Sequence, residues 1–314
     1  MRTRGLTVLL VAAGATLPIF IPWLKTPVIL AINNGLAVLG VLVLIRAGQV
    51  SFGHAMYVCA SGYAVAYAGR FFHLDGVVLI LAGTLASIVL GALIGLFIVR
   101  YRAIFFGMLN VAFSMVLYSI LVKFSTYTGG SDGMRVDRPP FAGFTFERSG
   151  FETTLLYVSI CIAVLAALIV QRYFASASGQ ALAAIKTNET RLEYLGISAR
   201  RVFWGGYVAS AALCGLGGSI AALAQGLVTP ETGYWVRSGE LVFIAILGGS
   251  SQAIGAFLGA VVFEFVRLYA AAYVTGAWQL VLGTALIVII FAAPSGLVGL
   301  VTRFGRGRAG GHAS

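Results

Sequence analysis

Few side chains in this sequence could do chemistry, and most of them stand singly inside apolar runs. Glu264 and Arg267 are spaced so that they share one face of a helix, where their charges can neutralise each other. Charge pairs inside a membrane are often buried between helices, and we expect this packing role here. A lining role in a polar pathway is the alternative.

Other polar side chains are embedded in apolar runs without an obvious partner. Each costs free energy in an apolar medium unless it is hydrogen-bonded. Each is therefore a candidate either for lining a polar pathway or for hydrogen bonding between helices. For the histidine, an interfacial hydrogen bond is preferred over contact with a ligand. The candidates are Asn33, Asn34, Gln49, Ser51, His54, Asn110 and Ser114.

Patterns typical of enzymes are missing from the sequence. The apolar runs hold no Ser-His-Asp set, HExxH motif or paired catalytic carboxylates, and no G-x-x-x-x-G-K-[ST] loop could cradle a nucleotide. Cys59, Cys161 and Cys214 fall singly in separate runs, without the spacing of a disulfide framework or a zinc site. We therefore expect no cofactor or metal bound by this chain, and a membrane-embedded transferase is the last-ranked interpretation.

The composition is that of an integral membrane protein. Of 314 residues, 60% are hydrophobic and only 10% are charged, against roughly 25% charged in an average soluble protein. Apolar runs of about 20 residues recur, long enough to cross a ~30 Å hydrocarbon core as helices. The alternation of barrel strands is absent, so we predict an all-α polytopic transmembrane bundle, with residues 1–314 as one domain.

We predict nine or ten spans. The first follows a basic start but lacks a small-x-small cleavage site, so it is kept as a helix rather than a signal peptide. The run from Leu241 to Gly249 is short and precedes a glycine-rich stretch, which allows either a broken crossing or a re-entrant hairpin; the charge distribution favours a crossing. Small residues such as Gly217 and Gly218 predict close helix packing. The spans are Leu6 to Ile21, Val28 to Ile45, Val50 to Ala68, Gly76 to Val99, Ala103 to Val122, Thr153 to Val170, Val202 to Ala224, Leu241 to Gly249, Ile254 to Val274 and Ala277 to Ala292.

The basic residues predict the orientation. With the N-terminus in the cytoplasm, most of the 21 basic residues fall on one face, opposed there only by Glu189 and Glu193, while charges cancel on the other face. The excess behind the net charge of +11 therefore marks the cytoplasmic side. Anionic membrane lipids account for this charge more simply than nucleic acid, which we do not expect as a partner.

Two connections are long, residues 123–152 outside the membrane and residues 171–201 in the cytoplasm. The glycines from Thr128 to Met134 predict a turn in the outer loop. The inner loop predicts a helix pair, with one piece from Ala181 to Lys186 and a second, short helix after it.

Local signals define the second helix. Asn188 is a natural N-cap, Glu189 lies in the first turn, and Gly196 stands just past the end. Leu192 and Ile197 suit the hydrophobic contact of a Schellman ending. Leu192 and Leu195 also form an apolar edge, which we expect to face outward. Such an edge fits either a connector on the bilayer surface or a docking helix for a soluble partner.

Six stretches, in this order, resemble the permease subunits of bacterial ABC importers for branched-chain amino acids, the LivM-like branch. The resemblance covers most of the chain. It is carried by GQVSFGHA (Gly48 to Ala55), TGGSDGM (Thr128 to Met134), GQALAAIKTNETRLEYLGI (Gly179 to Ile197), SAALCGLGGSIAAL (Ser210 to Leu223), ILGGSSQAIGAFLGA (Ile246 to Ala260) and PSGLVGL (Pro294 to Leu300).

The resemblance implies a coupling helix that seats on an ATP-hydrolysing subunit. The matching positions are Glu189, Glu193, Leu195, Gly196 and Ile197. Arg191, Leu192 and Tyr194 depart from the family, which more often has small residues there. With the local signals added, the expected docking segment comprises Asn188, Glu189, Leu192, Glu193, Leu195, Gly196 and Ile197.

The resemblance also implies partners and a location. These are two ATP-binding subunits that use the ATP, a second homologous permease, an extracytoplasmic solute-binding protein, and the bacterial inner membrane. Similar permeases carry urea, short amides or aromatic acids, so the solute stays open, as does the choice between a homodimer and a heterodimer of permeases. A secondary transporter that needs no ATPase is the rival from another class.

Overall fold

The computed structural model describes residues 21–299, apart from 73, 142, 250–251, 274–277 and 293–295, together with residues 14, 16 and 18. Its elements are almost all helical. In chain order they are η1 Pro22–Leu24, α2 Lys25–Arg46, α3 Ala55–Phe72, α4 Gly76–Ile98, α5 Ala103–Lys123, α6 Ser125–Thr128, η2 Gly130–Asp132, β1 Met134–Arg135, α7 Arg148–Ala175, α8 Ala177–Thr187, α9 Glu189–Tyr194, α10 Ala199–Gln225, β2 Leu227–Val228, η3 Pro230–Gly233, α11 Trp235–Gly248, α12 Ala253–Tyr273 and α13 Trp278–Ala292.

Six of these helical segments are long and apolar enough to cross a membrane. The result confirms an α-helical polytopic membrane protein. The predicted first span, Leu6 to Ile21, lies almost entirely outside the described residues, so the number of spans and the side of the N-terminus remain predictions. The six segments are Pro22–Arg46, Gly76–Ile98, Ala103–Lys123, Arg148–Ala175, Ala199–Gln225 and Ala253–Tyr273.

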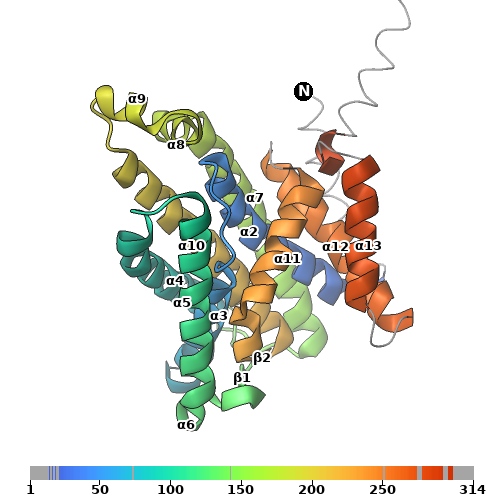
Figure 1. Cartoon of the computed structure of the whole chain (residues 1–314). Helices are drawn as coiled ribbons and strands as arrows, with labels where there is room; N and C mark the ends of the chain where they lie inside the picture. Colours follow the sequence, from blue (N-terminus) through green and yellow to red (C-terminus); the bar gives the residue numbers. More distant parts are fainter. Residues whose placement is uncertain are drawn as a thin grey trace, which may run out of the picture.

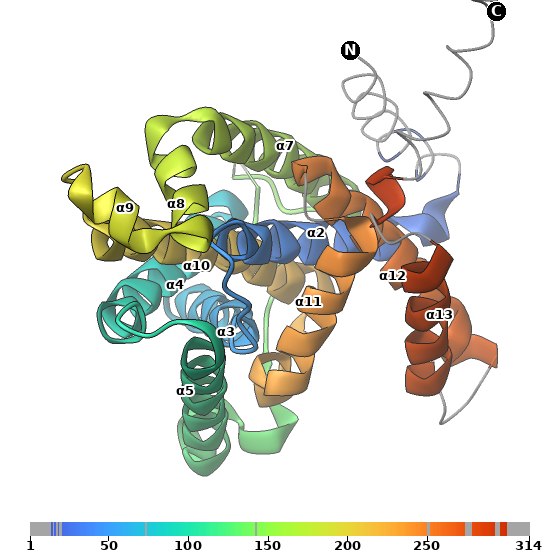
Figure 2. The same ribbon diagram turned by 45° about the horizontal axis from the view of Figure 1, so that its top comes forward.

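Helices α2 and α10 form the centre of the bundle. Helix α2 is enclosed by α7, α10, α11 and α12 (Figures 1 and 2), and nearly all of its residues from Asn33 to Leu44 are buried. The predicted close packing is confirmed on α10: a Cβ on Gly217 would lie 2.6 Å from the carbonyl oxygen of Asn33, and one on Gly218 would overlap that of Val58. Small residues thus bring backbones together, as in other membrane bundles.

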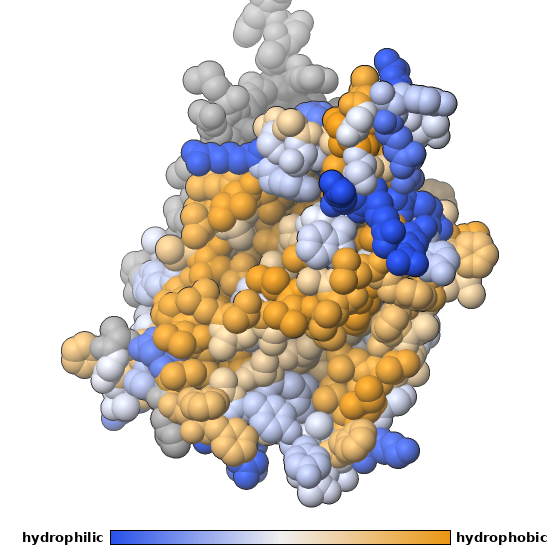
Figure 3. Space-filling model, turned by 90° about the vertical axis from the view of Figure 1, so that its left-hand side faces the viewer, coloured by the Kyte–Doolittle hydropathy of each residue, from blue (hydrophilic) through white to orange (hydrophobic). Residues whose placement is uncertain are grey.

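The outer faces of the bundle are apolar. Figure 3 shows a belt of hydrophobic residues across the middle of one side, with hydrophilic residues gathered above it. Helices α4, α5 and α7 contribute large exposed side chains, among them Leu93, Phe105 and Leu168. A soluble monomer rarely exposes so continuous an apolar surface, whereas lipid tails would cover it.

Helix α3 begins five residues later than its predicted span. Residues 50–54 are not helical, although Ser51, Gly53 and His54 among them are buried. Gly53 packs on the backbone of Asn110, roughly two turns into α5, and the N–H of Ala55 donates to Ser238 Oγ at 2.9 Å. Irregular backbone is tolerated at membrane depth only where protein satisfies it. Here the N–H of Gly53 donates to Ser51 Oγ, and Gly53 packs on α5.

Helix α11 covers the uncertain run from Leu241 to Gly249 and begins earlier, at Trp235. Its 14 residues reach about 21 Å, less than the ~30 Å of a hydrocarbon core. The preceding segment from Gly226 to Tyr234 consists largely of β2 and the 3₁₀ turn η3, and it packs on α3 and α5. Helix α12 runs back beside α11, with Gly259 against the carbonyl of Ile244. The short helix α11 therefore follows a segment that contains no α-helix. The depth of α11 in the membrane stays a prediction.

The predicted loop 123–152 contains more structure than expected. Gly129, Gly130 and Gly133 have positive φ angles of 74°, 59° and 75°, which confirms the turn. Strand β1 then pairs with β2 in antiparallel register, with Met134 opposite Val228. The all-α prediction missed this small sheet because its pairing joins segments far apart in the sequence. Helix α7 already begins at Arg148, inside the predicted loop.

Candidate functional site

Helices α8 and α9 form the predicted helix pair, at the end of the bundle opposite β1 and β2 (Figure 1). Asn188 caps α9: its Oδ1 accepts from the N–H of Arg191 at 2.9 Å. The helix ends in a Schellman motif, in which the N–H of Ile197 donates to the carbonyl of Leu192 and that of Gly196, at φ 78°, donates to Glu193. Both predicted ends of this helix are confirmed.

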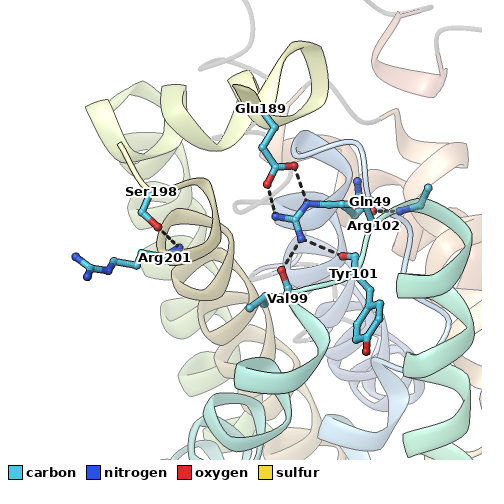
Figure 4. A network of polar contacts seen from close by, with 8 residues as sticks. Gln49, Val99, Tyr101, Arg102, Glu189, Ser198 and Arg201 are labelled. Atoms are coloured by element: carbon cyan, nitrogen blue, oxygen red, sulfur yellow. Dashed lines mark hydrogen bonds and ion pairs between the residues drawn. The ribbon is translucent and has the colours of Figure 1, made fainter. Parts of the chain in front are cut away.

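An ion pair ties α9 to the bundle. Glu189 receives two bonds from Arg102, Nη2 to Oε1 at 2.7 Å and Nε to Oε2 at 3.0 Å (Figure 4). Arg102 also donates to the carbonyl oxygens of Val99 and Tyr101, and its guanidinium lies 4.5 Å from the centre of the Phe203 ring. The arginine thus links the α4–α5 connection, α9 and α10 at one point.

The exposed apolar edge of α9 differs from the prediction. Leu192 is 5% exposed and belongs to the hydrophobic core, so its expected place on the outward edge is wrong. The motif that ends the helix turns the chain so that Tyr194, at 88%, Leu195, at 71%, and Ile197, at 40%, face outward instead. Glu193 is also exposed. A compact apolar tip projects from the bundle, with Leu192 anchoring it from behind.

The candidate Asn110 lies where α3, α5 and α10 meet, next to two tyrosines that were not among the candidates. The hydroxyl of Tyr57 donates to that of Tyr207 at 2.8 Å, and the hydroxyl of Tyr207 donates to Asn110 Oδ1 at 2.7 Å. Asn110 Nδ2 donates to the carbonyl of Phe106. Both polar atoms of the Asn110 amide therefore make hydrogen bonds within the chain, which fits the hydrogen-bonding alternative rather than the pathway.

Four more candidates lie close to this junction or to the irregular segments. Gln49 Oε1 accepts from the N–H of Ala103 at 2.6 Å, and Ser114 Oγ donates to the carbonyl of Gly233 at 2.6 Å. Ser51 Oγ is 2.6 Å from Nδ1 of His54. The second ring nitrogen of His54 is buried, and no residue in the described part of the chain bonds to it. These side chains form hydrogen bonds to, or within, the two segments Gly48 to His54 and Gly226 to Tyr234, neither of which is α-helical.

Asn34, on α2, belongs to a charged chain that joins α11, α2 and α12. The expected pair forms, with Arg267 Nη2 donating to Glu264 Oε1 at 3.0 Å. Asn34 Nδ2 donates to the other oxygen of Glu264 at 3.1 Å, and Asn34 Oδ1 accepts from Arg237 at 2.9 Å. Arg237 also pairs with Glu240. Positive and negative groups thus alternate from α11 through α2 to α12.

Asn33 lies beside this chain but takes no part in it. It is 4% exposed, and neither its Nδ2 nor its Oδ1 has a hydrogen-bond partner among the described residues. Asn33 is one of the residues that line a cavity of about 30 Å³. Further lining residues are Leu30, Asn34, Val58, Gln225, Arg237, Leu241 and Arg267. Of the candidates, Asn33 and Asn34 are the ones that this cavity brings together.

Sequence reasoning missed Arg237, Glu240 and Gln225 in this region. Arg237 and Glu240 precede Leu241, where the predicted span begins, so the prediction leaves them in an external connection. Their spacing matches that of Glu264 and Arg267, three residues apart at the edge of an apolar run. That repeated spacing is a signal from which a second intrabundle pair could have been predicted.

The comparisons with known proteins agree with this architecture. Residues 26–291 match the family described as the permease component of the branched-chain amino acid transport system. Two relatives are the high-affinity branched-chain amino acid transport system permease proteins LivM of Salmonella typhimurium, strain LT2, and Escherichia coli, strain K12. Each is 24% identical over 80% of this chain. The chain spans 64% of the length of these curated relatives.

No solved structure matches the chain. The apolar helices and the permease relatives together support a multi-pass protein of the inner membrane. Its place among known proteins is set by the family match, which covers α2 through nearly all of α13. The chain belongs to the family of branched-chain amino acid transport permease components.

Proposed function

We propose that this chain is one permease subunit of an ABC importer for branched-chain amino acids. In this proposal a second, homologous permease supplies the other half of the pathway, two ATP-binding subunits dock in the cytoplasm, and a solute-binding protein delivers the solute outside. The family and the names of the relatives support the solute class and the transport role.

The apolar tip of α9 is the observation that carries the proposal. Tyr194, Leu195 and Ile197 expose large apolar surfaces at the end of a helix that is capped at both ends and tied to the bundle by Arg102. An apolar helix edge of this kind fits a groove on a soluble partner. Because α8 and α9 pack on α7, α10 and each other, a displacement of the tip would be transmitted to the long helices.

Mechanistically, ATP binding would favour one arrangement of the docked ATPases. The tip would then shift the bundle between outward-open and inward-open states, which requires that the partner bind the two states with different affinity.

The proposal is tested by substituting Leu195→Asp in the full chain, co-expressed with candidate ATP-binding subunits. We expect loss of the purified complex and of ATP-driven leucine uptake. Leu227→Asp is the matched control, because Leu227 is also partly exposed but lies in β2 at the other end of the bundle. Undiminished assembly and uptake by the Leu195→Asp variant would refute docking at α9.

A second measurement distinguishes the proposed ATP-driven importer from a secondary transporter. Uptake that survives depletion of ATP but collapses with a protonophore would indicate a secondary transporter. The solute itself is identified by the ligand of the neighbouring solute-binding protein, with urea, short amides and aromatic acids as the competing outcomes.

A further inference from the structure

We infer that the cavity at Asn33 is a binding site for the charged head group of an α-amino acid on its way through the bundle. The inference rests on the proposed function and adds a site and its chemistry to it. The cavity lies between the first half of α2, α10 and the start of α11, in the half of the bundle away from α8 and α9. In the proposed orientation this is the outer half.

Asn33 supplies the first argument. A buried amide without partners costs on the order of 1–3 kcal/mol, and such groups in folded proteins are nearly always paired with protein or water. Its two unpaired atoms, Nδ2 and Oδ1, belong to a residue that lines this cavity. A primary carboxamide can donate to a carboxylate and accept from an ammonium at the same time. These are the two groups that every α-amino acid carries.

The arginines supply the second argument. Arg267 uses only its Nη2 in the described hydrogen bonds, and both arginines border the cavity. A guanidinium carries five N–H donors in a planar fork that suits a carboxylate. The carboxylate would lie against Arg237 or Arg267, and the ammonium against the amide oxygens of Asn33 and Gln225.

Charge balance selects a zwitterion over a simple ion. Arg237 is already paired with Glu240, and Arg267 with Glu264, so the four charges cancel. A net anion or cation added here would leave an uncompensated charge in a low-dielectric environment, which is costly. A zwitterion brings no net charge and extends the alternation of signs.

The cavity is large enough for the carboxylate part of such a head group. By the same measure of volume, one water needs about 10–15 Å³, so about 30 Å³ holds two or so waters, or a carboxylate. A whole branched side chain does not fit in this state. The apolar side chains of Leu30, Val58 and Leu241 complete the lining, and would border the side chain of the solute once the site widens.

The test is direct binding to the purified full-length chain in lipid nanodiscs, without ATP or partners. L-leucine is compared with 4-methylpentanoate, which lacks the ammonium, and 3-methylbutylamine, which lacks the carboxylate. We expect leucine to bind at least tenfold more tightly than either analogue. Asn33→Leu should weaken leucine binding at least tenfold. Thr84→Val, which removes a buried polar group away from the cavity, should leave leucine binding unchanged.

The outcomes separate the site from the proposed function. No binding of leucine, equal binding of the three compounds, or full binding by a folded Asn33→Leu variant would overturn the site. If leucine uptake by the assembled transporter persists in that case, the proposed function stands and only the site fails. Since the comparison of analogues uses the unmodified chain, it decides the matter even if the Asn33→Leu variant does not fold.

Discussion

Arg102 and Glu189 form a two-point ion pair that fixes the start of α9 to the connection between α4 and α5. Their side chains are 24% and 35% exposed. A pair this accessible contributes about 1 kcal/mol or less to folding. Its bidentate geometry, however, fixes the direction of the helix that follows. We therefore assign it a positioning role for the exposed tip rather than a stabilising one.

Arg102→Met tests that role. We expect the free energy of unfolding to change by no more than ~1 kcal/mol, while ATP-driven uptake falls several-fold because the α9 tip is no longer held against the bundle. The exchange of both charges, Arg102→Glu with Glu189→Arg, should restore part of the uptake. Thermal unfolding and uptake are measured on the same preparations. Uptake at the level of the unmodified protein in Arg102→Met would contradict a positioning role.

Close packing by α10 predicts opposite effects for two glycines on the same helix. A Cβ on Gly218 would overlap the carbonyl of Val58 and the side chain of Ser61, whereas one on Gly205 meets nothing within 4 Å. Gly218→Ala should therefore destabilise the protein by ~1–3 kcal/mol. Gly205→Ala should be neutral, or stabilising by ~0.5–1 kcal/mol. Chemical unfolding in mixed micelles gives both values, and equal effects would show that α10 does not pack as described.

The buried tyrosines predict an order of effects. Tyr207→Phe removes both the acceptor of the Tyr57 hydroxyl and the donor to Asn110, whereas Tyr57→Phe removes only one bond and leaves Tyr207 bonded to Asn110. Each orphaned buried group costs on the order of 1–3 kcal/mol, so Tyr207→Phe should be the more destabilising of the two. Tyr127→Phe, at an exposed side chain, is the control and should change stability little. A reversed order would mean that the hydroxyls are not connected in this way.

The spanning helices and the α9 caps could be predicted because their causes are local. Lipid leaves a backbone no partner but itself, so an apolar run of sufficient length becomes a helix, as α2, α4 and α12 confirm. The ends of α9 follow from single residues, Asn188 and Gly196, acting on their neighbours.

The rest depends on contacts between distant segments. The start of α3 involves residues far along the chain, because Gly53 packs on Asn110 and the N–H of Ala55 donates to Ser238. Leu192 turns inward because the bundle offers it an apolar surface, although the periodicity of α9 alone placed it beside Leu195. The polar cavity combines residues from α2, α3, α10, α11 and α12, and neither spacing nor composition shows that these meet.

The pair Glu264–Arg267 predicts non-additive mutants. Glu264 is 3% exposed and accepts bonds from both Arg267 and Asn34. Glu264→Leu leaves those donors without an acceptor and should cost ~3–5 kcal/mol. Replacing both members by leucine should cost less than the sum of the single changes, by ~0.5–3 kcal/mol, because no charge is then left unpaired.

The ion pair of Arg148 and Glu152 provides the matched comparison, because it also joins neighbouring turns of one helix. The side chain of Arg148 is 77% exposed, so water already solvates its charge when the partner is removed. Its double-mutant cycle should therefore give a coupling of only ~0.3–0.5 kcal/mol. Coupling energies of equal size at the two pairs, measured by unfolding in the same micelles, would show that Glu264 is solvated and that the charged chain between α2, α11 and α12 does not form.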